Sequence, residues 1–297
     1  MSSSMLDIPQ TPVAVAGGGG RWIPLLMPAV PLAVLLLFVV VGIAAPLLTP
    51  HDPVRNDLIN QLRPPSWIVN GSPDHPLGTD SFGRDVLARL LYGARVSLSV
   101  AAFSLLIAVT IGTVIGLTAG YAGGWVDSAL MRLVDIVNTV PTILLALVLA
   151  ASVGPSFTVV VLVLGLLIWP RIARLLRGET LVLRRTDFVR YAVAIGVPTW
   201  VIVAKHVLRN VLPTLLVATT LEVGRVILLE ASLSFLGAGL PAPQASWGVM
   251  IADGRALIAT GWWVALFPGL VITITVLSSN ALGDWLRDHL DPKMRRT

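Results

Sequence analysis

The sequence predicts an all-α polytopic membrane protein with six transmembrane helices. Hydrophobic residues make up 55% of the 297 residues and charged residues only 12%. The mean hydropathy is +0.84, a value that water-soluble domains of this length rarely reach. Several runs contain no charged side chain and exceed the roughly 20 residues that a helix needs to cross a bilayer. They include residues 22–50, 96–126 and 256–283.

The chain is predicted to begin with a flexible cytoplasmic tail, residues 1–21, which contains a run of four glycines. A cleaved signal peptide is the alternative. It is disfavoured because the apolar run that follows is longer than the hydrophobic region of a signal peptide. The unit 22–95 then starts with the first span, at 26–48. An external segment follows that is rich in Pro, Asn, Asp and Gly as far as Asp74, and we expect it to be irregular.

Residues 84–98 show a helical pattern, with apolar side chains on one side and Arg84, Asp85 and Arg89 toward the other. Two interpretations are open. The stretch is either an amphipathic helix lying at the membrane interface or the beginning of the second span, which is predicted at 97–119. This span opens the main membrane unit, residues 96–284, which holds five of the six spans.

The uncharged run 136–170 is too long for one span, and a cluster of turn residues at 152–156 divides it. We therefore expect spans at 130–151 and 157–176. The fifth and sixth spans are predicted at 210–231 and 263–283. Prolines inside membrane helices free a backbone carbonyl and permit kinks, which are also common without a functional role. The prolines within these spans are Pro141, Pro213 and Pro268.

The distribution of Lys and Arg predicts that both termini are cytoplasmic. The segment 171–209 and the C-terminal tail 285–297 are strongly basic, whereas Arg255 is the one basic residue of the external loop 232–262. The external segment 49–95 contains five arginines, against this rule, but its aspartates offset them. The net charge of +5 is therefore explained by membrane topology, and we expect a lipid bilayer and no nucleic acid as partner.

The residue types argue against catalysis. There is no cysteine and no Gly-rich loop followed by Lys and Ser or Thr, so nucleotide hydrolysis by that route is excluded. No serine stands in a nucleophile-elbow context. The four histidines are scattered without metal-ligand spacing; they are His51, His75, His206 and His289. We expect no catalytic residue, no metal site and no cofactor bound by this chain.

Ionisable residues inside the spans are the better functional candidates, because a charge at mid-bilayer costs about 2.5–3.5 kcal/mol on insertion scales. Glu222 and Arg225 are three residues apart and are predicted to pair. They either line a translocation path or form a structural pair. Glu230 is expected near the external mouth. Arg132 and Asp135 are also predicted to pair, and a structural role is favoured for them.

Four further stretches are distinctive: HPLGTDSFGRDVLARLLYGARVSLSVA at 75–101, GYAGGWVDSALMRLVD at 120–135, EASLSFLGAGLPAPQASWG at 230–248 and LGDWLRDHLDPKMR at 282–295. With them the chain resembles, from about Trp22 onward, the C-type permease subunit of dipeptide and oligopeptide ATP-binding cassette (ABC) importers, which are binding-protein-dependent transport system inner membrane components. The resemblance implies a type I ABC importer transmembrane fold.

The resemblance also implies a function and partners. The chain would translocate di- or oligopeptides across the bacterial cytoplasmic (inner) membrane as a non-catalytic permease subunit. It would form a heterodimer with a second homologous permease subunit. Two cytoplasmic ATPase subunits would bind ATP and Mg and drive the movement, and an extracytoplasmic substrate-binding protein would deliver the substrate.

The cytoplasmic segment 178–209 resembles the EAA loop of this family, whose short helix sits in a groove of the ATPase. Arg190 and Tyr191 stand where the family presents an acid and a small residue, and Arg209 stands where it has proline. An apolar face is expected on this helix, formed by Val189, Ala192, Val193 and Gly196. Gly196 would allow close approach or end the helix. The candidate coupling residues, within the loop 187–210, are Val189, Arg190, Tyr191, Ala192, Val193 and Gly196.

Two other functions are weighed against a peptide importer. One is a self-contained secondary transporter or channel, which the charges in the fifth span favour but which would also predict inverted repeats. The other is an ABC importer of a related substrate, such as a nickel complex, glutathione or haem. An intramembrane enzyme is disfavoured because no nucleophile and base are arranged together.

Overall fold

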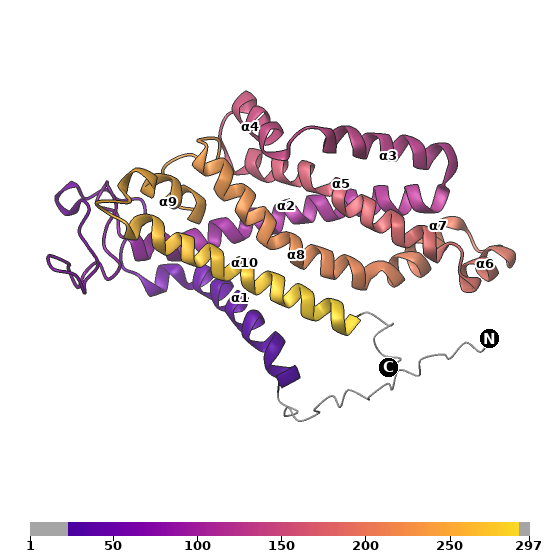
Figure 1. Ribbon diagram of the computed structural model, residues 1–297, viewed down its shortest axis with the longest axis horizontal. Helices are drawn as coiled ribbons and strands as arrows, with labels where there is room; N and C mark the ends of the chain where they lie inside the picture. Colours follow the sequence, from indigo (N-terminus) through magenta and orange to yellow (C-terminus); the bar gives the residue numbers. More distant parts are fainter. Residues whose placement is uncertain (1–22, 291–297) are drawn as a thin grey trace, which may run out of the picture.

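Five long helices lie side by side along the longest axis of the molecule in the computed structural model, which describes residues 23–290 (Figure 1). All five are long and apolar enough to cross a membrane. The described residues form no strand beyond one isolated bridge, between Thr79 and Asp85. The predicted all-α polytopic fold is thus confirmed. The five helices are α1 (Ile23–Leu48), α2 (Val86–Ala122), α5 (Phe157–Leu183), α8 (Leu208–Phe235) and α10 (Trp263–Leu290).

The remaining predicted span is broken. Helices α3 (Gly124–Thr139) and α4 (Thr142–Val153) meet at an angle of 83°, and counting the bent pair as one span gives six. Between them Val140 has the extended backbone (φ −88°, ψ 133°) that is usual before proline. The prediction of one helix over 130–151 is therefore wrong at this point, whereas the kink expected at Pro141 is present and amounts to a break.

Helices α2 and α5 form the centre of the bundle. A Cβ atom on Gly116 of α2 would lie 2.6 Å from the carbonyl oxygen of Ala173, and one on Gly112 would lie 2.8 Å from Cβ of Ile172. Small residues four apart are the means by which membrane helices approach this closely. In the most apolar window of each helix, 61% of residues are buried in α5 but only 17% in α1, so α1 lies at the periphery.

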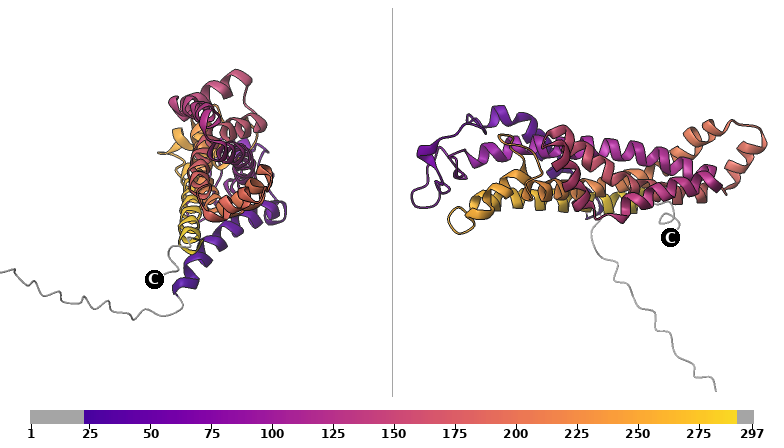
Figure 2. Two further views of the ribbon diagram at one scale, coloured as in Figure 1. Left: turned by 90° about the vertical axis from the view of Figure 1, so that its right-hand side faces the viewer. Right: turned by 90° about the horizontal axis from the view of Figure 1, so that it is seen from above.

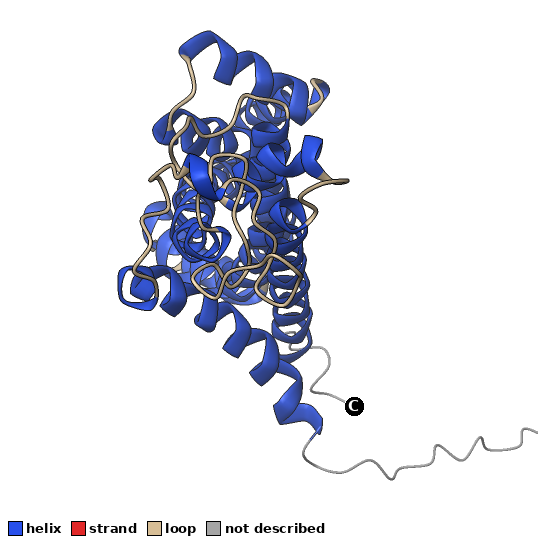
Figure 3. Ribbon diagram, turned by 90° about the vertical axis from the view of Figure 1, so that its left-hand side faces the viewer, coloured by secondary structure: helices blue, strands red, loops and turns tan. Residues whose placement is uncertain are grey.

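One end of the molecule carries the predicted external segment together with α9 (Trp247–Gly254) and the short helix η3 (Arg255–Leu257); Figure 3 shows their loops gathered there. The segment before Asp85 is irregular, as predicted, except for η1 (Leu58–Asn60). Asp85 caps α2 by accepting a hydrogen bond from the backbone N–H of Ala88 at 2.6 Å. Because α2 is continuous from Val86, no separate interfacial helix forms over 84–98, and the second interpretation is right.

The polar side of this first part of α2 is buried in an ion cluster. Arg84 lies 2.7 Å from Asp80 and 3.1 Å from Asp253 of α9. Arg89 pairs with Asp80 and lies 3.2 Å from Asp253. The interfacial interpretation would have exposed these arginines, but they are buried against Asp253, a partner on α9 that is distant in the sequence. Two cations and two anions balance one another here and join the external segment to α9.

The opposite end carries α6 (Asp187–Ala194), α7 (Thr199–Val201) and the π-helical turn η2 (Ile202–Val207). They project beyond the bundle in Figure 2. Helix α1 begins and α10 ends toward this end (Figure 1), which agrees with termini on the same side as the basic loop. Helix α10 extends into the predicted tail 285–297. The predicted tail 1–21 and residues 291–297 lie outside the described residues.

Candidate translocation pocket and coupling helix

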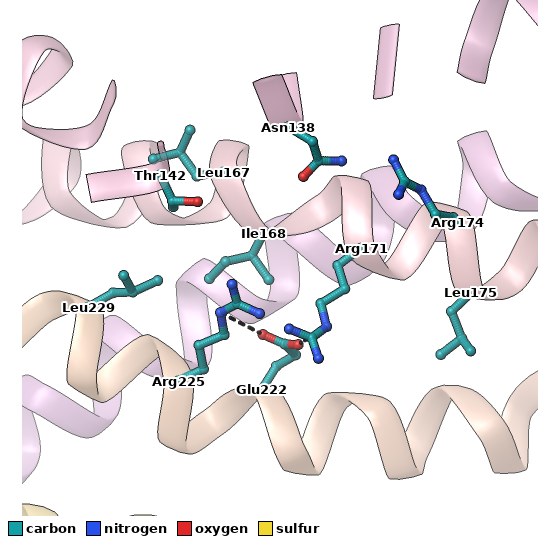
Figure 4. A pocket seen from close by; sticks show the side chains of 10 residues that line it. All are labelled: Asn138, Thr142, Leu167, Ile168, Arg171, Arg174, Leu175, Glu222, Arg225 and Leu229. Carbon is teal, nitrogen blue, oxygen red and sulfur yellow. Dashed lines mark ion pairs between the residues drawn. The ribbon is translucent and has the colours of Figure 1, made fainter. Parts of the chain in front are cut away.

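A cavity of about 460 Å³ lies between α5 and α8, beside the break between α3 and α4 (Figure 4). Its lining combines apolar side chains of both helices with three arginines, one glutamate and two uncharged polar groups. The lining residues are Asn138, Thr142, Leu167, Ile168, Arg171, Arg174, Leu175, Glu222, Arg225 and Leu229. A charged cavity inside the membrane region is a functional-site candidate, because such charges are costly there without a role.

Glu222 stands between two guanidinium groups in this cavity (Figure 4). Its Oε1 lies 3.1 Å from Nε of Arg171, and its Oε2 lies 4.0 Å from Nε of Arg225. The glutamate side chain is 8% exposed, whereas those of Arg171 and Arg225 are 67% and 43% exposed. The carboxylate is thus recessed, and the two cations are open to an incoming ligand.

The predicted Glu222–Arg225 pair is therefore present but long, and Arg171 of α5 is the nearer partner. Sequence reasoning missed this role of Arg171 because it assigned the residue to a cytoplasmic loop. Arg171 nevertheless falls within the predicted span 157–176, and a cation inside a span was the available signal.

The predicted Arg132–Asp135 pair does not form. Asp135 instead accepts a hydrogen bond from Arg174 of α5 at 2.9 Å. Nearby, Asp127 of α3 receives two hydrogen bonds from Arg177, at 2.5 and 2.7 Å. The aspartates of α3 pair with another helix, because α5 presents arginines along the side that faces α3. These contacts hold the broken span against the central helix.

Glu230 lies outside the cavity, at the end of α8 near α9. It is 1% exposed, and its Oε1 accepts hydrogen bonds from the hydroxyls of Ser234 and Ser246, both at 2.9 Å. Ser246 also caps α9 by accepting from the backbone N–H of Val249. The position at the external end matches the prediction, but the contacts make Glu230 a link between α8 and α9.

The structure turns part of the predicted apolar face of α6 outward, at Val193 and Gly196, and part of it inward. Val189 and Ala192 are buried, at 1% and 8% exposure, and α6 packs mainly against η2, so these two residues hold the helix in place. Of the predicted face, Val193 is exposed. Apolar and aromatic side chains on α6 and just after it are the ones that project: Phe188, Tyr191, Val193, Ile195 and Trp200. We call these five residues the outer face.

Gly196 ends α6, as one of its two predicted roles required. Its φ of +79° is in the left-handed region, its N–H donates to the carbonyl of Val193, and the N–H of Val197 donates to the carbonyl of Ala192, both at 3.0 Å. These two bonds are those of a Schellman motif, which favours glycine at this position. Arg190 lies beside Arg184 and Arg185 in a basic hollow at the junction of α5 and α6.

The turn η2 connects the outer face to α8 and was not foreseen. A π-helical turn inside a longer helix is rare and often marks a functional position. Here it joins α7 to the helix that carries Glu222. Helix α6 is therefore connected through α7 and η2 to a helix that lines the cavity.

Comparison with known proteins agrees with this arrangement. The profile of a family described as binding-protein-dependent transport system inner membrane component matches residues 112–296. The dipeptide transport system permease protein DppC of Bacillus subtilis (strain 168) is 40% identical over 266 residues, which is 89% of this chain and 81% of that protein. The probable D,D-dipeptide transport system permease protein DdpC of Escherichia coli (strain K12) is 38% identical, covering 88% and 85%.

Two further similarities extend the comparison. The glutathione transport system permease protein GsiD of Pectobacterium atrosepticum is 42% identical over 75% of this chain and 74% of that protein. A solved chain of the MetNI methionine ABC transporter, in an inward-facing conformation, superposes with a TM-score of 0.54 at 18% identity, covering 67% of this chain and 96% of that one. The chain belongs to the family of binding-protein-dependent transport system inner membrane components, and it is a multi-pass protein of the cytoplasmic membrane.

Proposed function

We propose that this chain is the transmembrane permease subunit of an ATP-driven importer that moves di- or oligopeptides across the cytoplasmic membrane. The relatives named above as dipeptide and D,D-dipeptide permeases support the substrate class. The observation that carries the proposal is the charged cavity between α5 and α8, joined through η2 to an exposed helix at the opposite end from α9.

The cavity suits a peptide because it offers both signs of charge together with apolar surface. A free peptide carries a carboxylate, an ammonium group and side chains of varied polarity. Arg171 and Arg225 are exposed enough to meet the carboxylate, and Glu222 is placed to meet the ammonium group. We propose that Glu222 and Arg225, with Arg171, line the translocation path at the junction with a second, homologous permease subunit, and that Glu230 stabilises the external end of that path.

The chain itself performs no catalysis in this proposal. Two cytoplasmic ATPase subunits bind ATP and Mg and hydrolyse the nucleotide, and the outer face of α6 seats in their groove. Exposed apolar side chains grouped on a short helix are the feature that a groove would bury. The coupling residues are then Tyr191 and Val193 by direct contact, Val189 and Ala192 by anchoring the helix, and Gly196 by ending it.

Arg190 contributes positive charge to the proposed docking surface. It stands with Arg184 and Arg185 in the basic hollow beside the outer face. A groove that accepts this helix needs acidic side chains at the matching position, since like charges across an interface are strongly unfavourable. We therefore propose an acidic rim on the ATPase partner, in place of the basic rim that an acidic residue at position 190 would require.

Affinity purification in mild detergent tests the assembly. The full chain is expected to bring with it a second permease and the ATPases, and a charge-reversing Arg190→Glu variant is expected to lose the ATPases while keeping the second permease. Retention of the ATPases by Arg190→Glu would contradict the acidic rim. Purification of the wild-type chain alone, active in transport, would contradict the proposed function and support a secondary transporter.

Binding assays on the substrate-binding protein of the same system test the substrate class. Dipeptides and tripeptides are expected to bind with higher affinity than glutathione, nickel complexes or haem. Preference for glutathione would contradict the peptide substrate class and favour the substrate named for the relative of Pectobacterium atrosepticum. The proposed role as the permease subunit of an ATP-driven importer would not be affected.

A further inference from the structure

We propose that the external end of this chain binds a divalent transition-metal cation of the zinc type, held by His51, His75 and Asp85. One potential ligand atom from each of these residues lies within 4.8 Å of the other two. The three come from separate parts of the chain: His51 follows α1, His75 lies in the irregular external segment, and Asp85 caps α2. This site is independent of the transport function proposed above.

The geometry needs only small adjustments to hold an ion. Nδ1 of His75 lies 2.9 Å from Oδ2 of Asp85, and the rings of His51 and His75 are 5.0 Å apart between centroids, tilted by 37°. Ligand atoms around a tetrahedral zinc ion are about 3.3 Å apart, given bond lengths of about 2.0–2.1 Å. The ring nitrogen of the half-buried His51, which lies within 4.8 Å of the other two ligand atoms, is the atom that must move closer.

A backbone carbonyl oxygen also lies beside these side chains. The carbonyl of Asp74 lies 2.9 Å from Nε2 of His51, so it is close enough to serve as a further oxygen ligand or to orient the ring. Two imidazole nitrogens with a carboxylate and a neutral oxygen make a donor set that suits Zn²⁺, Cu²⁺ and Ni²⁺ better than Ca²⁺ or Mg²⁺.

The charge balance of this region favours a cation at the site. The neighbouring ion cluster of Asp80, Arg84, Arg89 and Asp253 balances itself with two charges of each sign. Within the described residues, the one side chain paired with Asp85 is His75, which is cationic only when protonated. Asp85 has a side chain only 2% exposed, and a buried carboxylate is stabilised by a nearby positive charge. A metal ion would supply that charge.

The site joins the end of α1 to the start of α2 and fixes the irregular segment between them. It lies at the same end as α9, and His51, its one half-buried ligand, is the most exposed of the three. The sequence conceals the site because His51, His75 and Asp85 follow no common metal-binding spacing; the fold alone brings them together.

The test uses the full chain, purified without a polyhistidine tag and placed in lipid nanodiscs, titrated with Zn²⁺. We expect one equivalent to bind, the thermal unfolding midpoint to rise, and zinc-edge X-ray absorption to show imidazole nitrogen and oxygen ligands. His51→Gln is expected to weaken binding at least tenfold, and His75→Gln more. His206→Gln, in the π-helical turn at the opposite end, is the matched control and is expected to bind as the wild type does.

His51→Gln is the decisive variant, since His51 is half-buried and takes no part in the His75–Asp85 contact, so its loss leaves the cap of α2 intact. Absence of stoichiometric Zn²⁺ binding to the wild-type chain would overturn the proposal. So would wild-type affinity in a folded His51→Gln variant, or an absorption spectrum without imidazole ligands.

Discussion

Oε1 of Glu222 on α8 lies 3.1 Å from Nε of Arg171 on α5, and this contact joins two helices across the charged cavity. The carboxylate is recessed while the arginine is open to the cavity. The pair therefore adds little to stability, because an exposed guanidinium remains solvated. Two arginines beside one glutamate instead leave this part of the cavity with an excess of positive charge.

Removal of the carboxylate is expected to impair transport more than folding. Glu222→Gln leaves Arg171 and Arg225 facing the cavity without an anion, so a peptide carboxylate would be held too tightly and its ammonium group too weakly. We expect peptide uptake by the reconstituted complex to fall about tenfold or more, equivalent to ~1.4 kcal/mol in the barrier, at unchanged insertion. Glu179→Gln on α5 is the control, because Glu179 has no ion pair in the described part of the chain. Equal uptake by both variants would contradict the proposal that this cavity is part of the translocation path.

Gly196 should be replaceable only by residues that tolerate its backbone conformation. Its φ of +79° costs most residues about 1–2 kcal/mol, while no atom outside its immediate neighbours lies within 4 Å of an added Cβ. Gly196→Val is therefore expected to shift the end of α6 and to uncouple ATP hydrolysis from transport, with membrane insertion intact. Gly196→Asn is expected to stay close to wild type, since Asn adopts this conformation more readily. The ratio of peptide moved to ATP hydrolysed is the measurement, and an unchanged ratio in Gly196→Val would refute the docking role of α6.

The close contact of α2 and α5 predicts a stability effect at Gly116. A methyl group there would meet the carbonyl oxygen of Ala173 at 2.6 Å, which forces the two central helices apart. Overpacking of this kind typically costs about 1–3 kcal/mol, so Gly116→Ala is expected to lower the thermal unfolding midpoint in nanodiscs. Gly269→Ala on α10 is a matched control, because nothing lies within 4 Å of its added Cβ. A midpoint as high in Gly116→Ala as in the control would contradict the packing described here.

The buried ion cluster at the external end should be sensitive to the loss of one member. The side chains of Arg89 and Asp80 are each 1% exposed, so Arg89→Ala leaves two carboxylates, those of Asp80 and Asp253, with Arg84 as the one remaining cation of the cluster. Removing one partner of a buried pair typically costs about 3–5 kcal/mol. Arg55→Ala, on the exposed part of the external segment, is expected to have almost no effect. The measurement is the thermal unfolding midpoint of both variants. Similar midpoints would contradict the claim that the ion cluster stabilises the fold.

The number and order of the spans were predictable because apolar runs and turn residues act locally. The interruption at Pro141 was foreseen as a kink, but its size depends on α3 and α4 packing separately along α5. Contacts between residues that are distant in the chain could not be predicted from the sequence. Arg89 contacts Asp253, and Arg174 contacts Asp135, only in the folded structure. The same holds for His51 and His75, whose proximity no spacing indicates.

The outer face of α6 illustrates a second limit. Residues at helical spacing define a face, but the sequence does not say whether that face turns inward or outward. Val189 and Ala192 were expected to dock, but they are buried in the structure, where α6 packs mainly against η2. Tyr191 and Val193 project as a result.

The most direct test of the central proposal is dipeptide uptake into proteoliposomes, compared between the complete complex and this chain alone. The complete complex, supplied with binding protein and ATP, is expected to accumulate dipeptide against its gradient and to stop when the ATPases carry a hydrolysis-deficient substitution. The chain alone is expected to move none. Uptake by the lone chain without ATP, or undiminished uptake with inactive ATPases, would contradict the assignment as the permease subunit of an ATP-driven importer.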